Sequence, residues 1–322
     1  MPDCDDAPLD LETFDRLLAS APNQDAIKFY FNRHAASGIV LDALRHNLQG
    51  SDEDDEARRT RMDRLSAIFQ HIHIATLPRH HFGMLDHYRS SPLQTEGASS
   101  NNSFGKYLHV NGEQVMESWE TQWMRALARY GLRKTRSASA EGPVRVLELG
   151  WGQGISGREL LAGWNVNYTV IEIHPGVAAN ARKFFEDHGM SSHARVLEGA
   201  WEEVFPTLKD RTFDVVFADT WDTTRAKGRQ AWEFREPWYF NAYESCFVSL
   251  YRMLKPEGVL VYYDTGLRET YAGSSVTQKT LTWQPSLFNE VDIRKVGGLH
   301  AYGSTTYVEN GFNEAVLPAL RK

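Results

Sequence analysis

The chain has 322 residues, of which 42% are hydrophobic, 24% charged and 12% aromatic, so one large or two modest domains with an apolar core are expected. Its net charge of −7 argues against a nucleic-acid partner, and its two cysteines, Cys4 and Cys246, exclude a disulfide scaffold and a cysteine-built zinc module. The acidic N-terminus does not resemble a signal peptide, and no apolar run approaches the ~18 residues of a membrane span. These features predict a soluble cytoplasmic protein with no membrane partner.

Helical spacing of apolar residues dominates residues 1–88. The pattern runs from Leu11 to Leu18 and again from Met62 to Ile72, and an acidic stretch at 52–56 precedes the second run. Four histidines near the end of this region could suggest a metal site, but no acidic or cysteine partner stands at ligand spacing. We expect no metal and a partly buried helix end at these histidines, which are His71, His73, His80 and His81.

The domain organisation follows from changes in this pattern. Residues 1–88 are predicted to form a helical region that either dimerises the protein or covers its active site. Residues 89–103 are polar and rich in turn formers, which predicts a flexible linker or flap. Residues 104–322 are predicted to form the main domain.

Within the main domain, short apolar runs of strand length alternate with helical segments from residue 144 onward. This alternation predicts a parallel sheet with helices on both faces, and ligands of such sheets bind outside the carboxyl ends of the strands. The expected strands are 144–149, 168–173, 194–199, 213–219 and 258–264, and the expected helices are 119–130, 155–161, 176–187 and 239–253.

A glycine-rich turn follows the first of these strands. Gly150, Gly152 and Gly154 allow tight turning and close approach of the backbone to a ligand. Glu172 lies 22 residues after Gly150 at the end of the next strand, where its carboxylate can accept both hydroxyls of a ribose, or can simply face water. The dinucleotide fingerprint would need glycine at the position of Ile155, so the turn favours S-adenosylmethionine over NAD.

Acidic residues and methionines form a second candidate constellation. Met116, Glu120 and Met124 are spaced i, i+4, i+8, which predicts one helix with all three on a shared face, and Glu117 stands one turn before Glu120. Two buried methionines on a surface helix would explain this pattern equally well. Asp219, at the carboxyl end of an apolar strand, is either a helix cap or a site residue, and the sheet geometry favours the site.

Aromatic and basic residues alternate in residues 222–243, from Arg225 and Arg229 to Trp238 and Tyr243. Such interleaving can mark a nucleic-acid surface, which the acidic chain disfavours. Plain helix packing, or a wall around the substrate with an arginine that meets its carboxylate, fits better.

The blocks VNGEQVMESWETQWMRALA, VRVLELGWGQGISG, VIEIHPGV, LEGAWEEVFPTL and FDVVFADTW resemble the guanidinoacetate N-methyltransferase family and the related arginine N-methyltransferases from about residue 104 onward. In general character the chain is similar to the free-arginine methyltransferases of streptozotocin-type natural product biosynthesis. The resemblance implies the Rossmann-like sheet of a class I methyltransferase. It also implies that the enzyme uses S-adenosylmethionine and releases S-adenosylhomocysteine. It implies that Glu120 and Asp219 grip the guanidino group, with Glu117, Thr220 and Trp221 beside them, and that the cofactor meets Met116, Met124, Glu148, Gly150, Gly152, Gly154, Glu172, Ala200 and Trp201.

One departure from the family pattern bears on the substrate. The Thr-Ser pair that meets the substrate carboxylate in the family is replaced here by Gly266-Leu267, neither of which has a donor side chain. The resemblance therefore implies a terminal-guanidine N-methyltransferase with free L-arginine as the preferred small-molecule substrate. Guanidinoacetate and peptidyl arginine are the alternatives within the class. An NAD-dependent oxidoreductase and an inactive binding module are the alternatives outside it.

Overall fold

The computed structural model describes Asp54, Glu56, Ala57, Thr60, Asp63 and Ser66, and then residues 79–96, 107–110, 113–135, 142–163, 165–219, 249–263, 288, 290–299 and 314–322. The helices with bounds are α5 (Arg79–Ser90), η2 (Ser118–Glu120), α6 (Thr121–Lys134), α7 (Ile155–Leu161), α8 (Pro175–Asp187), α9 (Trp201–Val204) and η4 (Phe205–Thr207). The strands are β1 (Leu93–Glu96), β2 (Tyr107–Val110), β3 (Glu113–Glu117), β4 (Val144–Leu149), β5 (Val166–Glu172), β6 (Ala194–Glu198), β7 (Phe213–Ala218), β8 (Leu254–Tyr262), β9 (Glu290–Gly297) and β10 (Glu314–Arg321).

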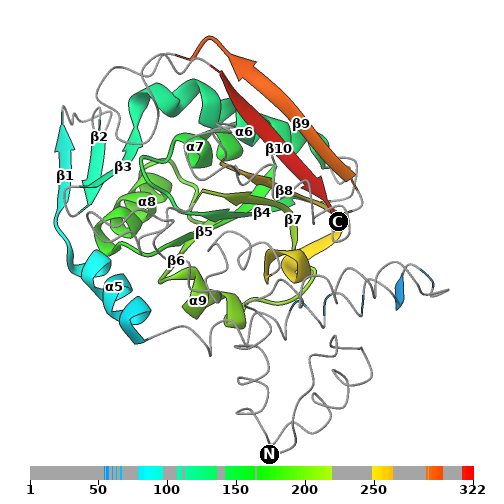
Figure 1. Ribbon diagram of the computed structural model, residues 1–322, viewed down its shortest axis with the longest axis horizontal. Helices are drawn as coiled ribbons and strands as arrows, with labels where there is room; N and C mark the ends of the chain where they lie inside the picture. The colour runs from blue at the N-terminus through cyan, green and yellow to red at the C-terminus, as the bar shows by residue number, and fades with distance from the viewer. Residues whose placement is uncertain are drawn as a thin grey trace, which may run out of the picture.

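A seven-stranded sheet with the order β6-β5-β4-β7-β8-β10-β9 forms the centre of the molecule (Figure 1). The five strands from β6 to β8 are parallel, and β10 is antiparallel to both of its neighbours. The five apolar runs of the sequence correspond to these parallel strands with ends shifted by a few residues, which confirms the predicted α/β fold. The strand order reverses between β4 and β7, so a ligand crevice is expected at their carboxyl ends.

Helices cover both faces of this sheet, because alternate strand residues point to opposite sides. On one face Val146, Phe217 and Val261 join a core with side chains of α6, α7 and α8. On the other face Leu147 and Leu260 join a second core with α9 and the helical residues 249–253, the described part of the predicted helix 239–253 (Figure 1).

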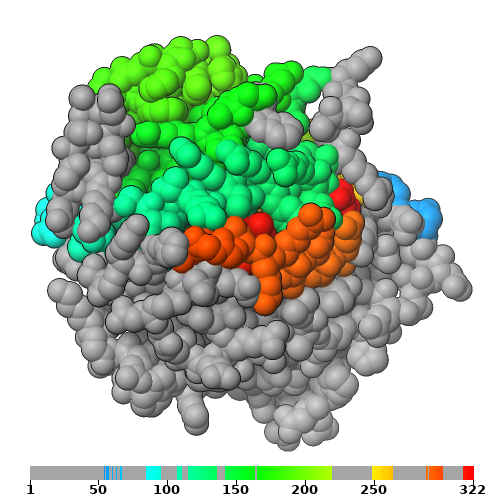
Figure 2. Space-filling view, turned by 90° about the horizontal axis from the view of Figure 1, so that it is seen from above, coloured from blue at the N-terminus to red at the C-terminus, as the bar shows by residue number. Residues whose placement is uncertain are grey.

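The end of the sheet at β9 packs beside α6, and the two elements lie side by side in Figure 2. Lys134 of α6 forms an ion pair with Asp292 of β9, and the Arg294 guanidinium lies 5.3 Å from the centre of the Tyr130 ring. The sequence did not predict β9 or β10. In β9, charged residues alternate with apolar ones, and this edge strand is half exposed along most of its length.

A small antiparallel sheet, β1-β2-β3, lies beside the carboxyl end of the parallel strands. A Cβ atom built on Gly176, at the start of α8, would stand 2.6 Å from Leu93 of β1, so the contact is close. This sheet changes the interpretation of residues 89–103, which were expected to form a linker or flap. Arg89 and Ser90 end α5, and Leu93–Glu96 pair with β2 as strand β1.

The described positions before residue 79 include part of the predicted N-terminal helical region. Glu56, Ala57, Thr60, Asp63 and Ser66 are all helical, and the Asp54 carboxylate accepts the Ala57 N–H at 2.8 Å. This bond is that of a helix N-cap, which explains why the helix starts within the acidic run. The apolar pattern around Leu11 lies outside the described residues. Among the helices that the structure describes, none is long and apolar enough to span a membrane.

Candidate active site

The turn between β4 and α7 is built from glycines that no other residue could replace without strain. Gly150, Gly152 and Gly154 all have positive φ angles, of 83°, 52° and 70°. A Cβ atom on Gly150 would lie 2.5 Å from the backbone oxygen of Asp219, and one on Gly152 would lie 2.9 Å from the sulfur of Met116. The turn is therefore held closely between the end of β7 and strand β3, as a ligand-binding turn at the strand crossover requires.

The buried side chain of Trp151 packs against the turn and the start of α7. Its indole would lie 2.4 Å and 2.3 Å from Cβ atoms added to Gly154 and Gly157. The ring also meets Tyr168 and Phe185 edge to face. The missing side chain at Gly154, predicted to make room for a cofactor, thus makes room for this indole. The sequence signal for this role was the pair of glycines three residues apart after a tryptophan.

The carboxylate of Glu172 lies directly against the turn. One oxygen accepts the Trp151 N–H at 2.8 Å and the other accepts the His174 N–H at 2.8 Å. Burial raises the pKa of this carboxyl above its usual value, while the backbone N–H groups of His174, Trp151 and Gly152 act to lower it. Each oxygen retains lone pairs, so the carboxylate can still accept the two hydroxyls of a ribose.

Glu148 lies fully buried beside the turn, on the same face of the sheet as Trp151. The hydroxyls of Ser156 and Tyr168 each donate to one of its carboxylate oxygens. Burial, with a smaller contribution from the charges of Asp219 and Glu172, raises its pKa to about 8 against the effect of these two hydrogen bonds. Glu148 is therefore an acid that neutral pH does not fully ionise.

Asp219 follows β7 and completes a group of three acids at the carboxyl edge. Its N–H donates to the Leu149 carbonyl at 3.2 Å, which fixes it beside the end of β4. Burial, and then the charge of Glu172, raise its pKa to about 7. Within the described part of the chain, no lysine or arginine side chain pairs with Glu148, Glu172 or Asp219. Within the described residues, this edge of the sheet thus presents two buried acids and one half-buried acid without a lysine or arginine partner.

The single helix predicted through Met116, Glu120 and Met124 is wrong. Met116 and Glu117 end strand β3, Glu120 ends the 3₁₀ helix η2, and Met124 lies in α6. The chain is extended at Glu117, with φ −131° and ψ 149°, because β3 pairs with β2 up to this residue. Met116 still reaches the turn, where its sulfur accepts the Gln153 N–H at 3.2 Å.

Glu117 and Glu120 form a reciprocal capping box at this strand-to-helix junction. Each carboxylate accepts the backbone N–H of the other residue, and the bond to Glu120 Oε1 measures 3.0 Å. Glu117 also accepts the indole N–H of Trp119. Both side chains are buried. These contacts are those of a structural cap in which Glu117 and Glu120 both take part.

Ala200 and Trp201 begin α9 after strand β6. Ala200 is buried, and its N–H donates to Glu203, which also pairs with Arg89 of α5. The Trp201 ring lies 5.1 Å from that of Phe205. Other predicted positions lie outside the described residues, namely Thr220, Trp221, residues 222–243 and Gly266-Leu267.

Gln153 was missed by the sequence analysis. Its side chain is 6% exposed, and its Nε2 is buried without a hydrogen-bond partner among the described residues. A buried amide without a partner costs free energy of folding. Because Gln153 lies in the glycine turn, a ligand with an acceptor oxygen could supply the missing partner. Within the described part of the chain, no three His, Cys, Asp or Glu side chains are grouped to hold a metal ion.

Comparison with known sequences identifies the family. A sequence model of guanidinoacetate N-methyltransferase matches residues 86–296, well over half of the chain. The chain belongs to this family. Members of the guanidinoacetate N-methyltransferase family are S-adenosylmethionine-dependent methyltransferases, and the seven-stranded sheet has the Rossmann-like architecture of such enzymes.

More distant relatives match shorter segments. An arginine N-methyltransferase of Aspergillus fumigatus is 29% identical over 36% of this chain and 26% of its own length. A Mycobacterium tuberculosis protein described as an O-methyltransferase is 36% identical over 26% of this chain and 38% of its own length. Among solved structures, a spermidine synthase with a bound transition-state analogue superposes with a TM-score of 0.47 at 19% identity, covering 71% of this chain and 73% of that one. The chain thus matches well under half of the length of these two curated relatives.

The residues at the turn fit the cofactor that the family uses. The glycine backbone is tightly packed from below by Trp151, the Glu172 carboxylate is fixed at the end of β5, and the amide of Gln153 has no protein partner in the described residues. In S-adenosylmethionine, the ribose hydroxyls could donate to Glu172 and the α-carboxylate could accept from the Gln153 amide. The sulfonium cation could then lie against the glycine backbone.

Proposed function

We propose that the protein transfers a methyl group from S-adenosylmethionine to a terminal nitrogen of a small guanidine, with free L-arginine as the preferred substrate. The observation that carries the proposal is the group of three acids at the carboxyl edge, the buried Glu148 and Glu172 and the half-buried Asp219, with no lysine or arginine partner among the described residues. A sulfonium and a guanidinium are both cations, and their encounter in a desolvated pocket needs negative charge nearby.

For the cofactor we propose the same residues that the turn positions. Glu172 would accept the ribose hydroxyls, Gln153 would donate to an acceptor oxygen, and Met116, Met124 and the Ala200-Trp201 pair would supply apolar contact. When bound, S-adenosylmethionine supplies a methyl carbon activated by its sulfonium. Glycines at 150 and 152 hold the turn against Asp219 and Met116, beside which the cofactor would bind.

For the substrate we propose that Asp219 and Glu120 fix the guanidino plane. A guanidinium has a pKa above ~12 and delocalised lone pairs, so it needs orientation, and one proton must leave during its attack. A bidentate carboxylate aligns one nitrogen for transfer, and an ionised carboxylate can accept the proton. Asp219, whose pKa is about 7, is ionised above that pH and is our candidate base.

For the choice of substrate, the sequence departure at Gly266-Leu267 supports arginine. Without donor side chains there, a short substrate such as guanidinoacetate would leave its carboxylate unpaired, whereas the carboxylate of arginine lies three methylenes farther away. The Aspergillus relative described as a protein arginine N-methyltransferase agrees with a guanidine of the arginine type.

The experiment is product analysis with S-adenosylmethionine and a panel of L-arginine, guanidinoacetate and an arginine-containing peptide. We expect mass spectrometry to find methylation of arginine at least ~100-fold more efficient than of guanidinoacetate. Creatine as the preferred product would overturn the substrate and keep the chemistry. No methylation of any guanidine, with S-adenosylmethionine bound in calorimetry, would overturn the reaction.

Calorimetry on Glu172→Ala tests the cofactor assignment separately. Loss of a bidentate acceptor should weaken S-adenosylmethionine binding about ten-fold or more, while NAD should bind neither protein. Unchanged affinity in a folded variant would refute the role of Glu172.

A further inference from the structure

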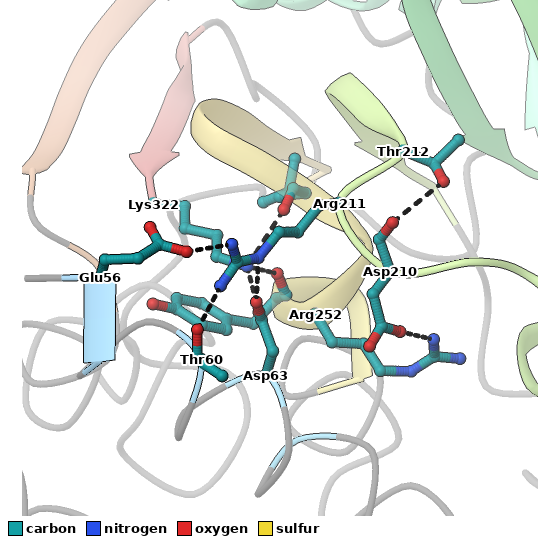
Figure 3. A network of polar contacts seen from close by, with 10 residues as sticks. Glu56, Thr60, Asp63, Asp210, Arg211, Thr212, Arg252 and Lys322 are labelled. Carbon is teal, nitrogen blue, oxygen red and sulfur yellow. Dashed lines mark hydrogen bonds and ion pairs between the residues drawn. The ribbon is translucent and has the colours of Figure 1, made fainter.

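A dense set of charged contacts surrounds Arg211 and Lys322 (Figure 3). It lies at the opposite edge of the sheet from the glycine turn. Arg211 stands two residues before β7, at the amino end of the parallel strands. Lys322 follows β10, which is antiparallel to β8, so that Arg321 pairs with Val259 near the amino end of the central strands. Both cations thus meet at the amino edge, away from Glu172.

These two cations bind one side of the N-terminal helix. Arg211 donates to Glu56 at 2.5 Å, to Asp63 at 2.6 Å and to the Thr60 hydroxyl at 3.0 Å. Lys322 donates to the other oxygen of Asp63. Positions 56, 60 and 63 share one helix face, so a polar stripe of the helix meets the main domain (Figure 3).

The receptor side of this contact is built by the main domain itself. The ammonium of Lys322 is fully buried and also donates to the Tyr251 and Leu254 carbonyls, at 2.9 Å and 3.1 Å. Its distance of 4.3 Å from the centre of the Tyr251 ring adds a cation–π contact. Asp63 therefore supplies the negative charge to a lysine whose other hydrogens the main domain has already satisfied.

The backbone of Arg211 gives an independent sign of a specialised position. Its φ of 49° lies in the left-handed region, which a non-glycine residue adopts at a cost. The loop holds this conformation through the Arg211 N–H, which donates to the Arg252 carbonyl at 2.8 Å. Arg252 in turn binds Asp210 and the Phe205 carbonyl, at 2.5 Å and 2.6 Å. None of these loop contacts involves the N-terminal helix.

We propose that Arg211 and Lys322 form a docking site for an acidic helix at the amino edge of the sheet. The segment with Glu56 and Asp63 occupies it in this chain, and the site accepts the same acidic helix in trans once that segment is displaced. The partner that fits is an acidic helical peptide with two carboxylates seven positions apart. The cofactor edge does not take part in the docking.

The experiment uses the full chain with Asp63→Asn, which changes only the docked helix, and with Arg211→Gly, which removes the guanidinium and relieves the left-handed backbone. Hydrogen exchange should show at least ~10-fold faster exchange over residues 54–66 in both variants, with the segment from 148 to 172 unchanged. Lys183→Ala, which removes an exposed pair with Asp187, is the matched control and should change neither region.

A labelled peptide of residues 50–70 then tests binding in trans. Fluorescence anisotropy should show it binding the Asp63→Asn chain at least ~10-fold more tightly than the unaltered chain or the Arg211→Gly chain. The same peptide carrying Asp63→Asn should bind none of them. The proposal is overturned by unchanged exchange at 54–66, by loss of protection throughout the protein, or by equal binding or no binding of the peptide.

Discussion

Buried acids have different partners at the two edges of the central sheet. At the amino edge Asp63 meets Lys322 and Arg211, and Asp214 of β7 receives the Lys255 ammonium at 2.8 Å. At the carboxyl edge Glu148 and Glu172 receive only hydroxyl and backbone N–H donors within the described structure. The first arrangement is complete within the protein and serves stability. The second leaves buried acids without a cation among the described residues, and a cationic ligand would favour their ionised forms.

The largest test of this difference is removal of charge at Asp219. We expect Asp219→Asn to lower turnover by about two to four powers of ten, because the variant loses the charge that pairs with the guanidinium and the base. Glu120→Gln should lower turnover by a similar factor. Glu117→Gln, at the capping box, should affect turnover far less. Steady-state kinetics with S-adenosylmethionine checks all three. Near-normal turnover of Asp219→Asn would place this residue with the structural acids.

The pH dependence of kcat/KM sharpens the comparison, because it reports groups of the free enzyme. Burial raises the pKa of Asp219 to about 7, and the ionised form is the one that binds a cation. We expect kcat/KM to rise about ten-fold per pH unit below pH ~7 and to level off above ~8. The step should vanish in Asp219→Asn. A flat profile across this range in the unaltered protein would contradict the assignment.

Gln153→Met separates a ligand contact from a packing role by two readouts of opposite sign. The substitution keeps the side-chain length and removes a buried amide without a partner, so the ligand-free protein should unfold at a higher temperature. Affinity for S-adenosylmethionine should fall by about five- to ten-fold, since a net hydrogen bond of about 1 kcal/mol is lost. Calorimetry and thermal unfolding measure the two effects. If stability falls instead, the amide is part of the protein's own structure.

Glu148→Gln tests the cost of the uncompensated acid itself. The pKa of Glu148 is raised to about 8, so its contribution to the stability of the ligand-free protein should be most favourable below the unfolded pKa near 4.5 and should be lost as the pH rises to 8. The neutral amide should remove this loss, with a melting temperature higher by roughly 5 °C at pH 8 and little changed at pH 5. Thermal unfolding at both pH values decides it. Equal shifts at the two would mean that ionisation is not the cause.

Much of the sheet could be predicted from the sequence, because β4, β5 and β7 are almost entirely buried and, like the second half of β8, read as apolar runs. Strands β9 and β3 were missed because they lack such an apolar run. Their charged residues, such as Asp292 and Glu113, mask the strand pattern. Glycines and acids of the turn were also found, since strand ends mark the ligand edge.

Spacing alone misled at Met116 and Glu120. Residues four apart share a helix face, but they also share a strand face, and pairing of β3 with β2 decided the conformation. Gln153 could not be singled out, because nothing in one sequence shows that an amide will be buried without a partner. The contact of Asp63 with Lys322 joins residues 259 positions apart, which no local pattern reveals.

That separation has a consequence for biosynthesis. The helix with Asp63 leaves the ribosome early, and the lysine that neutralises it is added 259 residues later. At typical elongation rates the segment waits roughly 10 to 50 s for its partner. Until this lysine is made, Asp63 lacks its buried cation, and the acidic run around it keeps the segment hydrated.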